Sequence, residues 1–89
     1  MKIKLELFGA SRDFSDKDHL EFKIKDKMEI KDFRKEIINY LKKNFKGNES
    51  FKKIVESSAF CSEDNNIIND SYKISRDQKI GIIPPIGGG

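Results

Sequence analysis

The chain of 89 residues contains one cysteine, one histidine, two prolines and no tryptophan. A single cysteine, Cys61, cannot form an internal disulfide, which argues against the disulfide-rich class of small secreted domains. One cysteine and one histidine, His19, also provide no zinc-ligand spacing and no nucleophile-base pair, so we expect no metal site and no catalysis by this chain alone. We interpret Cys61 as a small buried apolar residue and His19 as a side chain on the surface of a strand.

Long apolar segments are missing as well. No run of residues approaches the ~18 needed to span a membrane, and charged side chains interrupt the first six positions. We therefore expect no membrane contact and, with so little cysteine, a reducing aqueous compartment such as the cytosol. Leu, Ile, Val and Phe account for 25 of the 89 residues, which is above the roughly one fifth below which chains stay disordered. The length allows one domain.

The net charge of +3 conceals a basic segment. Residues 31–53 carry eight Lys and Arg against three Asp and Glu, a balance of +5 that leaves −2 for the remainder. A basic helix face of this kind can contact nucleic acid or an acidic protein. However, only three of the 18 cations are Arg, and no basic stripe with interleaved aromatic residues is present. We therefore interpret this segment as a solvated face and expect no nucleic-acid binding.

The first quarter of the chain has the two-residue period of β-strands. Residues 2–8 alternate between apolar side chains and charged ones, and residues 19–25 repeat the pattern with Leu20, Phe22 and Ile24 on the apolar side. The segment between them is rich in Gly, Ser and Asp, so we predict an antiparallel hairpin with a long loop.

The period then changes to that of a helix over residues 30–46, followed by a Gly47 suited to a helix end. A short helical turn with Ser50 as its cap is expected at residues 50–55. The remaining patterns predict strands at three places, namely residues 58–62, 67–68 and 79–83. These elements predict an α+β roll in which one main helix covers a mixed sheet of four to five strands. We expect residues 1–83 to form this single domain and residues 84–89 to form a flexible tail.

The tail is unusual in a chain that is 37% charged, because residues 80–89 contain no charged or polar side chain. Pro84 and Pro85 end the last strand and stiffen the exit from it. The final segment, Gly87–Gly89, has no side chains, so its backbone fits a channel too narrow for a Cβ atom. We therefore predict that the tail delivers the carboxylate of Gly89 into the active site of another protein.

The ending Pro-Pro-Ile-Gly-Gly-Gly, after the strand Ile80–Ile83, resembles the terminus of the molybdopterin synthase small subunit, a ubiquitin-like sulfur carrier family. The opening segment, residues 4–10, resembles the first strand of that family, although Gly9 replaces part of its usual aromatic pair. The resemblance implies a β-grasp fold, which is the ubiquitin-like form of the α+β roll.

The resemblance also implies a chemical cycle. An ATP-dependent activating enzyme would join Gly89 to AMP, and a sulfur donor would displace AMP to leave a thiocarboxylate. The large catalytic subunit would then use this sulfur to convert precursor Z (cyclic pyranopterin monophosphate) into molybdopterin, in an assembly of two small and two large chains. The implied cofactors are ATP, used by the activating enzyme, and covalent sulfur at Gly89, with none bound permanently.

We expect the partner-binding residues to lie along the tail and beside it. The apolar side chains of Phe8, Phe60, Ile83 and Ile86 are predicted to form an exposed docking patch for the large subunit. Within this hypothesis, some of them, notably Phe8 and Phe60, can instead cover the edge of the core. The complete set of predicted partner-binding residues is Phe8, Phe60, Ile83, Pro84, Pro85, Ile86, Gly87 and Gly88.

Other functions fit parts of this pattern. Sulfur carriers for thiamine synthesis or for tRNA thiolation also end in Gly-Gly but lack the Pro-Pro step, and a ubiquitin-like protein modifier more often has an Arg near its tail. A noncatalytic adaptor domain is the alternative from a different class, and a glycine tail can also be a frayed end or a linker. The apolar residues that precede the glycines favour the carrier interpretation.

Overall fold

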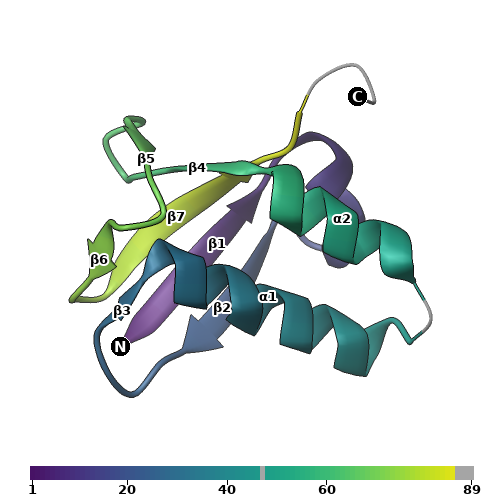
Figure 1. Cartoon of the computed structure of the whole chain (residues 1–89), viewed down its shortest axis with the longest axis horizontal. Helices are drawn as coiled ribbons and strands as arrows, with labels where there is room; N and C mark the ends of the chain where they lie inside the picture. The colour runs from purple at the N-terminus through teal and green to yellow at the C-terminus, as the bar shows by residue number, and fades with distance from the viewer. Residues whose placement is uncertain (47, 86–89) are drawn as a thin grey trace.

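The structure is a computed structural model in which residues 1–46 and 48–85 are described. Within these residues the helices and strands follow one another as shown in Figure 1. In chain order they are β1 (Lys2–Leu7), the 3-10 helix η1 (Gly9–Phe14), β2 (His19–Lys23), β3 (Met28–Glu29), α1 (Ile30–Asn44), α2 (Glu49–Ser57), β4 (Ala59–Cys61), β5 (Ile67–Ile68), β6 (Lys73–Ile74) and β7 (Gln78–Ile83).

A five-stranded sheet organises the molecule, with the strand order β2-β1-β7-β4-β5. β1 and β7 are parallel, whereas the other neighbours are antiparallel. The predicted mixed sheet is therefore confirmed, and β5 is the edge strand expected at residues 67–68. None of the helices in the described part of the chain is both long and apolar enough to cross a membrane.

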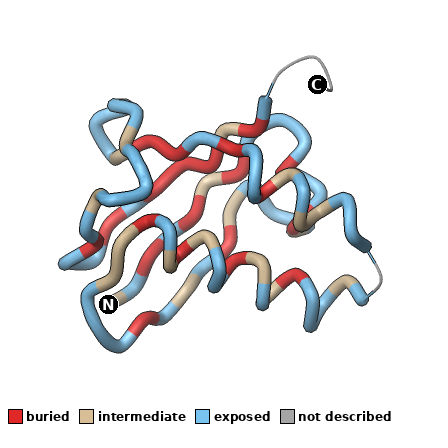
Figure 2. The backbone as a smooth tube through the Cα atoms, in the orientation of Figure 1, coloured by how far each residue is buried: buried red, intermediate tan, exposed pale blue. Residues whose placement is uncertain are grey.

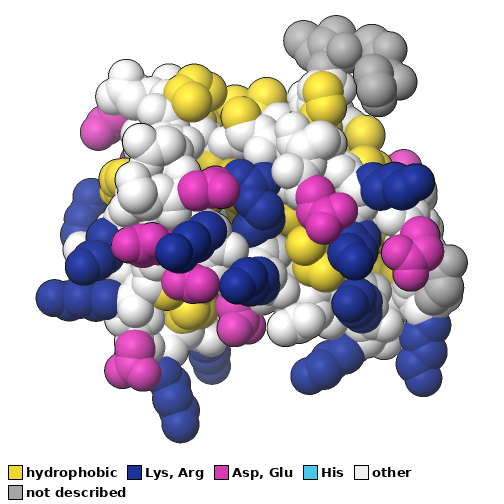
Figure 3. All heavy atoms as spheres, in the orientation of Figure 1, with side chains coloured by type: hydrophobic (Ala, Val, Ile, Leu, Met, Phe, Trp, Pro, Cys, Tyr) yellow, Lys and Arg dark blue, Asp and Glu magenta, His cyan; other side chains and the backbone are white. Residues whose placement is uncertain are grey.

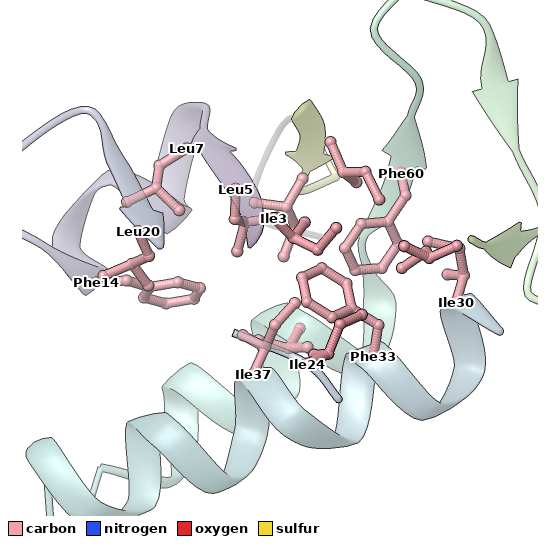
Figure 4. Packing of buried hydrophobic residues seen from close by; sticks show 14 of the residues in the cluster. Ile3, Leu5, Leu7, Phe14, Leu20, Ile24, Ile30, Phe33, Ile37 and Phe60 are labelled. Carbon is pink, nitrogen blue, oxygen red and sulfur yellow. The ribbon is translucent and has the colours of Figure 1, made fainter. Parts of the chain in front are cut away.

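The core lies between the sheet and the two helices, which cover the same face (Figure 1). β1 contributes Ile3, Leu5 and Leu7, each at most 2% exposed, as its two-residue period predicts. The apolar stripe of α1 meets them, and Figure 4 shows Ile37 and Phe33 pointing toward the sheet. Figure 2 shows buried residues along the central strands and on the side of α1 that faces them. The buried residues of α1 are Ile30, Phe33, Ile37 and Leu41.

The helix α1 begins without a side-chain cap, because its N-cap residue is Glu29 and no side-chain hydrogen bond closes that end. Backbone carbonyls from a distant turn replace the cap. The N–H of Ile30 donates to the carbonyl oxygen of Tyr72 at 2.9 Å, and the N–H of Lys31 donates to that of Asp70 at 3.1 Å. Donors that are free at a helix start are therefore satisfied by tertiary structure. The carboxyl end follows at Phe45, and Gly47 lies outside the described residues.

Several short elements differ from the sequence prediction. The helical turn expected at residues 50–55 is the longer helix α2, and its N-cap is Asn48, so the assignment of Ser50 as the cap was wrong. The rings of Phe14 and Phe45 pack on Phe51 of α2 with centroids 4.9 and 5.1 Å away, which supports the helix through contacts distant in sequence. η1 lies within the predicted loop, and the two-residue strands β3 and β6 are too short to show a period.

Arg34 of α1 connects three parts of the fold. Its Nη1 donates to the carbonyl oxygens of Val55 and Ser58 at 2.7 and 2.8 Å, at the end of α2 and just before β4. Its Nη2 contacts the carboxylate of Asp70 at 2.6 Å, in the turn that also caps α1. The guanidinium lies 4.8 Å from the ring centroid of Phe60. Because the Arg34 side chain is only 17% exposed, its bonds to the carbonyl groups of Val55 and Ser58 are partly shielded from water, whereas the Asp70 carboxylate is 56% exposed.

The predicted exposure of Phe60 is wrong, since this side chain is 1% exposed and belongs to the core. As expected, successive residues of β4 point to opposite faces of the sheet. The docking hypothesis placed Phe60 on the exposed face, but Phe60 points into the core. Phe60 pairs with Ile82 of β7 and shares its helix-facing side, while Ala59 and Cys61 face the other way. Burial of the large ring under Arg34 favours this orientation over burial of the small Ala59.

We expect Arg34→Leu to lower the free energy of unfolding by about 3 kcal/mol, because it removes the donor that two buried carbonyl groups share. Lys35→Leu is the matched control on the same helix, since Lys35 is exposed, and it should change stability by less than about 0.5 kcal/mol. Urea unfolding followed by circular dichroism measures both. Equal losses of stability would contradict a clamping role for Arg34.

Phe60→Ala should cost about 3–5 kcal/mol, the range for deleting a buried phenylalanine ring. In contrast, Phe8→Ala should cost about 1 kcal/mol or less, because Phe8 is 45% exposed. Thermal unfolding of the two variants compares the positions directly. A Phe60→Ala protein as stable as the wild type would show that Phe60 is not a core residue.

Candidate functional site

The tail leaves the domain from the centre of the sheet. β7 lies between β1 and β4, and its ladder ends at Ile83, because the prolines that follow have no N–H to donate. Pro84 is buried and Pro85 is exposed. The start of the tail is therefore packed against the domain, and the chain emerges at Pro85.

The end of β1 lies beside this exit. In the parallel register, Leu7 is the partner of Ile82, so Phe8 and Ile83 follow at the same edge. Gly9 then has a φ of 55°, a left-handed conformation that favours glycine, and a Cβ atom there would lie 4.0 Å from Cδ of Pro84.

The buried side chain of Ser11 holds this turn. The N–H of Phe8 donates to Oγ of Ser11 at 2.9 Å, and that hydroxyl donates to the carbonyl oxygen of Phe8 at 2.7 Å. Ser11 is completely buried. These two bonds fix the backbone of Phe8 next to the base of the tail.

An apolar surface surrounds the exit on the sheet face opposite the helices. We call it the exit patch. Cross-strand pairing places its members together, because Cys61 is opposite both Gly81 and Ile67, and Ala59 is opposite Ile83. Phe8 is 45% and Ile67 is 67% exposed, whereas Ile83 is half-buried. The exit patch consists of Phe8, Ala59, Cys61, Ile67, Gly81 and Ile83.

Gly81 provides a notch in the middle of the exit patch. A Cβ atom at this position would lie 2.7 Å from Sγ of Cys61 and 3.0 Å from Cε2 of Phe8. Both approaches are closer than normal van der Waals contact, so any side chain would displace one of these groups. The absence of a side chain lets the Phe8 ring lie close to the strand and beside the thiol, which is 8% exposed.

The remainder of the open sheet face is charged. Nζ of Lys79 pairs with the carboxylate of Glu6 at 3.2 Å. The ring of His19, half-buried on β2, hydrogen-bonds the carboxylate of Asp18 at 2.9 Å, and this bond holds the pKa of Asp18 below its ordinary value. The expected placement of His19 on a strand is confirmed. The open face thus has a charged half over β1 and β2 and an apolar half next to the tail.

The structure brings together only some of the predicted site residues. Phe8 and Ile83 lie in the exit patch, and Pro84 and Pro85 lie at its edge, whereas Phe60 lies on the opposite side of the sheet. Ile86, Gly87, Gly88 and Gly89 lie outside the described residues. Their predicted roles in partner binding and sulfur transfer stay predictions.

Sequence reasoning missed Gly81, Cys61, Ala59 and Ile67 as members of the surface around the tail. A glycine inside a strand is a signal of close approach by another group, and the shared parity of Ala59 and Cys61 indicated a common face. The register of β4 against β7 was needed to combine these signals. The prediction that Cys61 is a buried apolar residue is confirmed by its 8% exposure.

The described residues form no group of three or more His, Cys, Asp or Glu side chains placed to share a metal ion. In residues 1–46 and 48–85, every fully buried side-chain nitrogen and oxygen has a hydrogen-bond partner.

Comparison with known proteins establishes the fold. No model of a protein family and no curated protein matches the sequence. Among solved structures, molybdopterin converting factor subunit 1 from Pyrococcus furiosus superimposes with a TM-score of 0.69 at 15% identity, over 96% of this chain and 98% of that one. SAMP1 from Haloferax volcanii superimposes with a TM-score of 0.68 at 10% identity over the whole of both chains. The chain has the β-grasp fold of these two proteins, as the sequence predicted.

The single thiol of Cys61 reports on the exit patch. We expect it to react slowly with a thiol reagent in the native protein, and Phe8→Ala to raise the rate about tenfold or more, because the Phe8 ring and the sulfur both lie against Gly81. Phe8→Tyr is the matched control, since it keeps the ring and should keep the slow rate. A Phe8→Ala protein that is folded by circular dichroism and reacts at the wild-type rate would show that Phe8 does not shield Cys61.

Proposed function

We propose that this chain is a ubiquitin-like sulfur carrier that serves as the small subunit of a molybdopterin synthase. The observation that carries the proposal is the tail, in which Pro84 and Pro85 are followed by Ile86 and three glycines. The likeness in fold to a protein described as a molybdopterin converting factor subunit supports this assignment. The choice of molybdopterin synthase among sulfur-carrier pathways rests on the sequence, because the Pro-Pro step distinguishes the tail from those of thiamine and tRNA-thiolation carriers.

The proposed reactive group is the carboxylate of Gly89. A carboxylate is a poor electrophile because oxide is a poor leaving group, so it must first be activated. A carboxylate oxygen attacks the α-phosphorus of ATP, pyrophosphate leaves, and an acyl adenylate forms. Hydrosulfide then attacks the carbonyl carbon, the bond to the AMP oxygen breaks, and the thiol proton is lost. The products are AMP and a C-terminal thiocarboxylate.

The geometry of the exit suits delivery of this group. Burial of Pro84 fixes where the tail begins, and the four residues after Pro85 span at most about 14 Å when extended. Glycine at the last three positions lets the terminal atoms enter a narrow channel. The acids, bases and substrate pocket of the synthase reaction belong to the large subunit, and this chain supplies the sulfur to its substrate, precursor Z.

The exit patch is the proposed docking surface for the large subunit. It surrounds the base of the tail, so a partner that covers it also receives the tail. Phe8 is the proposed anchor, because it is aromatic, partly exposed and held in place by Ser11 and the notch at Gly81. Phe60 is buried and is therefore not part of the proposed docking surface, which instead includes Ile67 and Ala59. We propose two small and two large chains for the assembly, and cytosol as its location.

Intact mass spectrometry after incubation with ATP, an adenylating enzyme of a sulfur-carrier pathway and sulfide should show the mass gain for replacement of one oxygen by sulfur. Deletion of Gly88 and Gly89, or an uncleaved extension after Gly89, should abolish this gain without changing the thermal transition, because both remove the reactive carboxylate from its position.

Other outcomes identify the alternatives. Sulfur loading by the shortened chain would exclude Gly89 as the acceptor. An adaptor domain would show no change in mass, and a protein modifier would form adducts with other proteins. Incubation of the loaded chain with the large subunit and precursor Z separates a molybdopterin carrier from a thiamine or tRNA-thiolation carrier, since only the first yields molybdopterin.

A further inference from the structure

A second surface lies away from the tail, where α1 ends and α2 begins. Lys and Arg side chains gather at this end of the molecule, at the lower right of Figure 3. Here residues of the two helices and of the turn between them line an open cavity of about 140 Å³. Its lining residues are Lys42, Phe45, Lys46, Asn48, Glu49 and Lys52. We call it the lysine cavity.

The lysine cavity has an excess of positive charge. Its lining residues include three lysines and one glutamate. Within the described part of the chain, the recorded ion pairs involve none of Lys42, Lys46 and Lys52. By contrast, Arg34 on the same helix α1 is bonded to Asp70. The three lysines therefore present positive charge that internal pairing does not neutralise.

An aromatic ring is also part of the lining. The half-buried Phe45 is held against Phe51 of α2, so its ring is supported from the protein side. A glutamate or aspartate side chain matches this combination, because its methylene carbons can pack on the ring while its carboxylate lies among the lysines. The cavity is smaller than the ~300 Å³ at which pockets begin to enclose drug-sized ligands, which fits a single side chain.

We infer that the lysine cavity binds an acidic segment of a partner protein, with one carboxylate side chain inserted over Phe45. Nucleic-acid surfaces commonly add Arg and exposed aromatic rings for stacking. The lining of the lysine cavity contains no Arg, and its one aromatic residue is half-buried. An acidic peptide therefore fits better than a polynucleotide. Attraction of this kind raises the rate of association more than the affinity.

The full chain can be titrated against a fluorescent deca-glutamate peptide at low salt, with anisotropy as the readout. The variant K42Q/K46Q/K52Q should weaken binding about tenfold, which is about 1.4 kcal/mol, because it removes three surface charges that each contribute little. The control K4Q/K23Q/K25Q removes the same charge from exposed positions on and after β1 and β2 and should weaken binding less than about twofold. Amide NMR shifts caused by the peptide should be concentrated in α1 and α2.

Three results would overturn the inference. Absence of peptide binding at low salt would show that the lysine cavity is not a binding site. Equal weakening of peptide binding by the two triple variants would indicate a response to net charge alone. An oligothymidylate of matched charge that binds more tightly than the peptide, and is lost in the cavity variant, would make the surface a nucleic-acid site. Sulfur loading of Gly89 is not part of the readout, so the proposed carrier function is tested separately.

Discussion

The parallel pairing of β1 with β7 determines where the chain leaves the sheet toward its tail. Parallel neighbours finish at the same edge of a sheet, so Phe8 after β1 and Pro84 after β7 emerge side by side. The chain between them adds three further strands to the same sheet and also forms both α-helices. Because both helices lie on one face (Figure 1), the other face stays open at the tail.

The open face therefore has two parts with different chemistry. Around the exit, small residues on β4 and β7 leave room for Phe8, and the notch at Gly81 lets its ring and the thiol of Cys61 both approach the strand. Farther from the exit, the same face carries charged side chains, such as the pair of Glu6 on β1 with Lys79 on β7. The apolar part surrounds the base of the tail, and the lysine cavity lies between the helices.

The elements with sustained periods were predictable, and the short ones were not. Alternation over six residues placed β1, and the stripe from Ile30 to Leu41 placed α1, because each pattern repeats often enough to exclude the other period. β3 and β6 have two residues each and depend on pairing across the chain. Parity showed that Ala59 and Phe60 face opposite sides, but only packing against Arg34 decided which side is the core. The tail could be predicted because its composition differs from that of the rest of the chain. The notch at Gly81 could not be predicted without the strand register.

The proposed carrier function depends on the carboxylate of Gly89 being the group that is converted to the thiocarboxylate. The most direct measurement is tandem mass spectrometry of the loaded protein, with fragment ions that contain the last residues. The account predicts that the sulfur mass is found in the smallest fragment that includes Gly89 and is lost when that fragment is hydrolysed to the acid. Sulfur located on Cys61, or on any residue before Pro84, would contradict it.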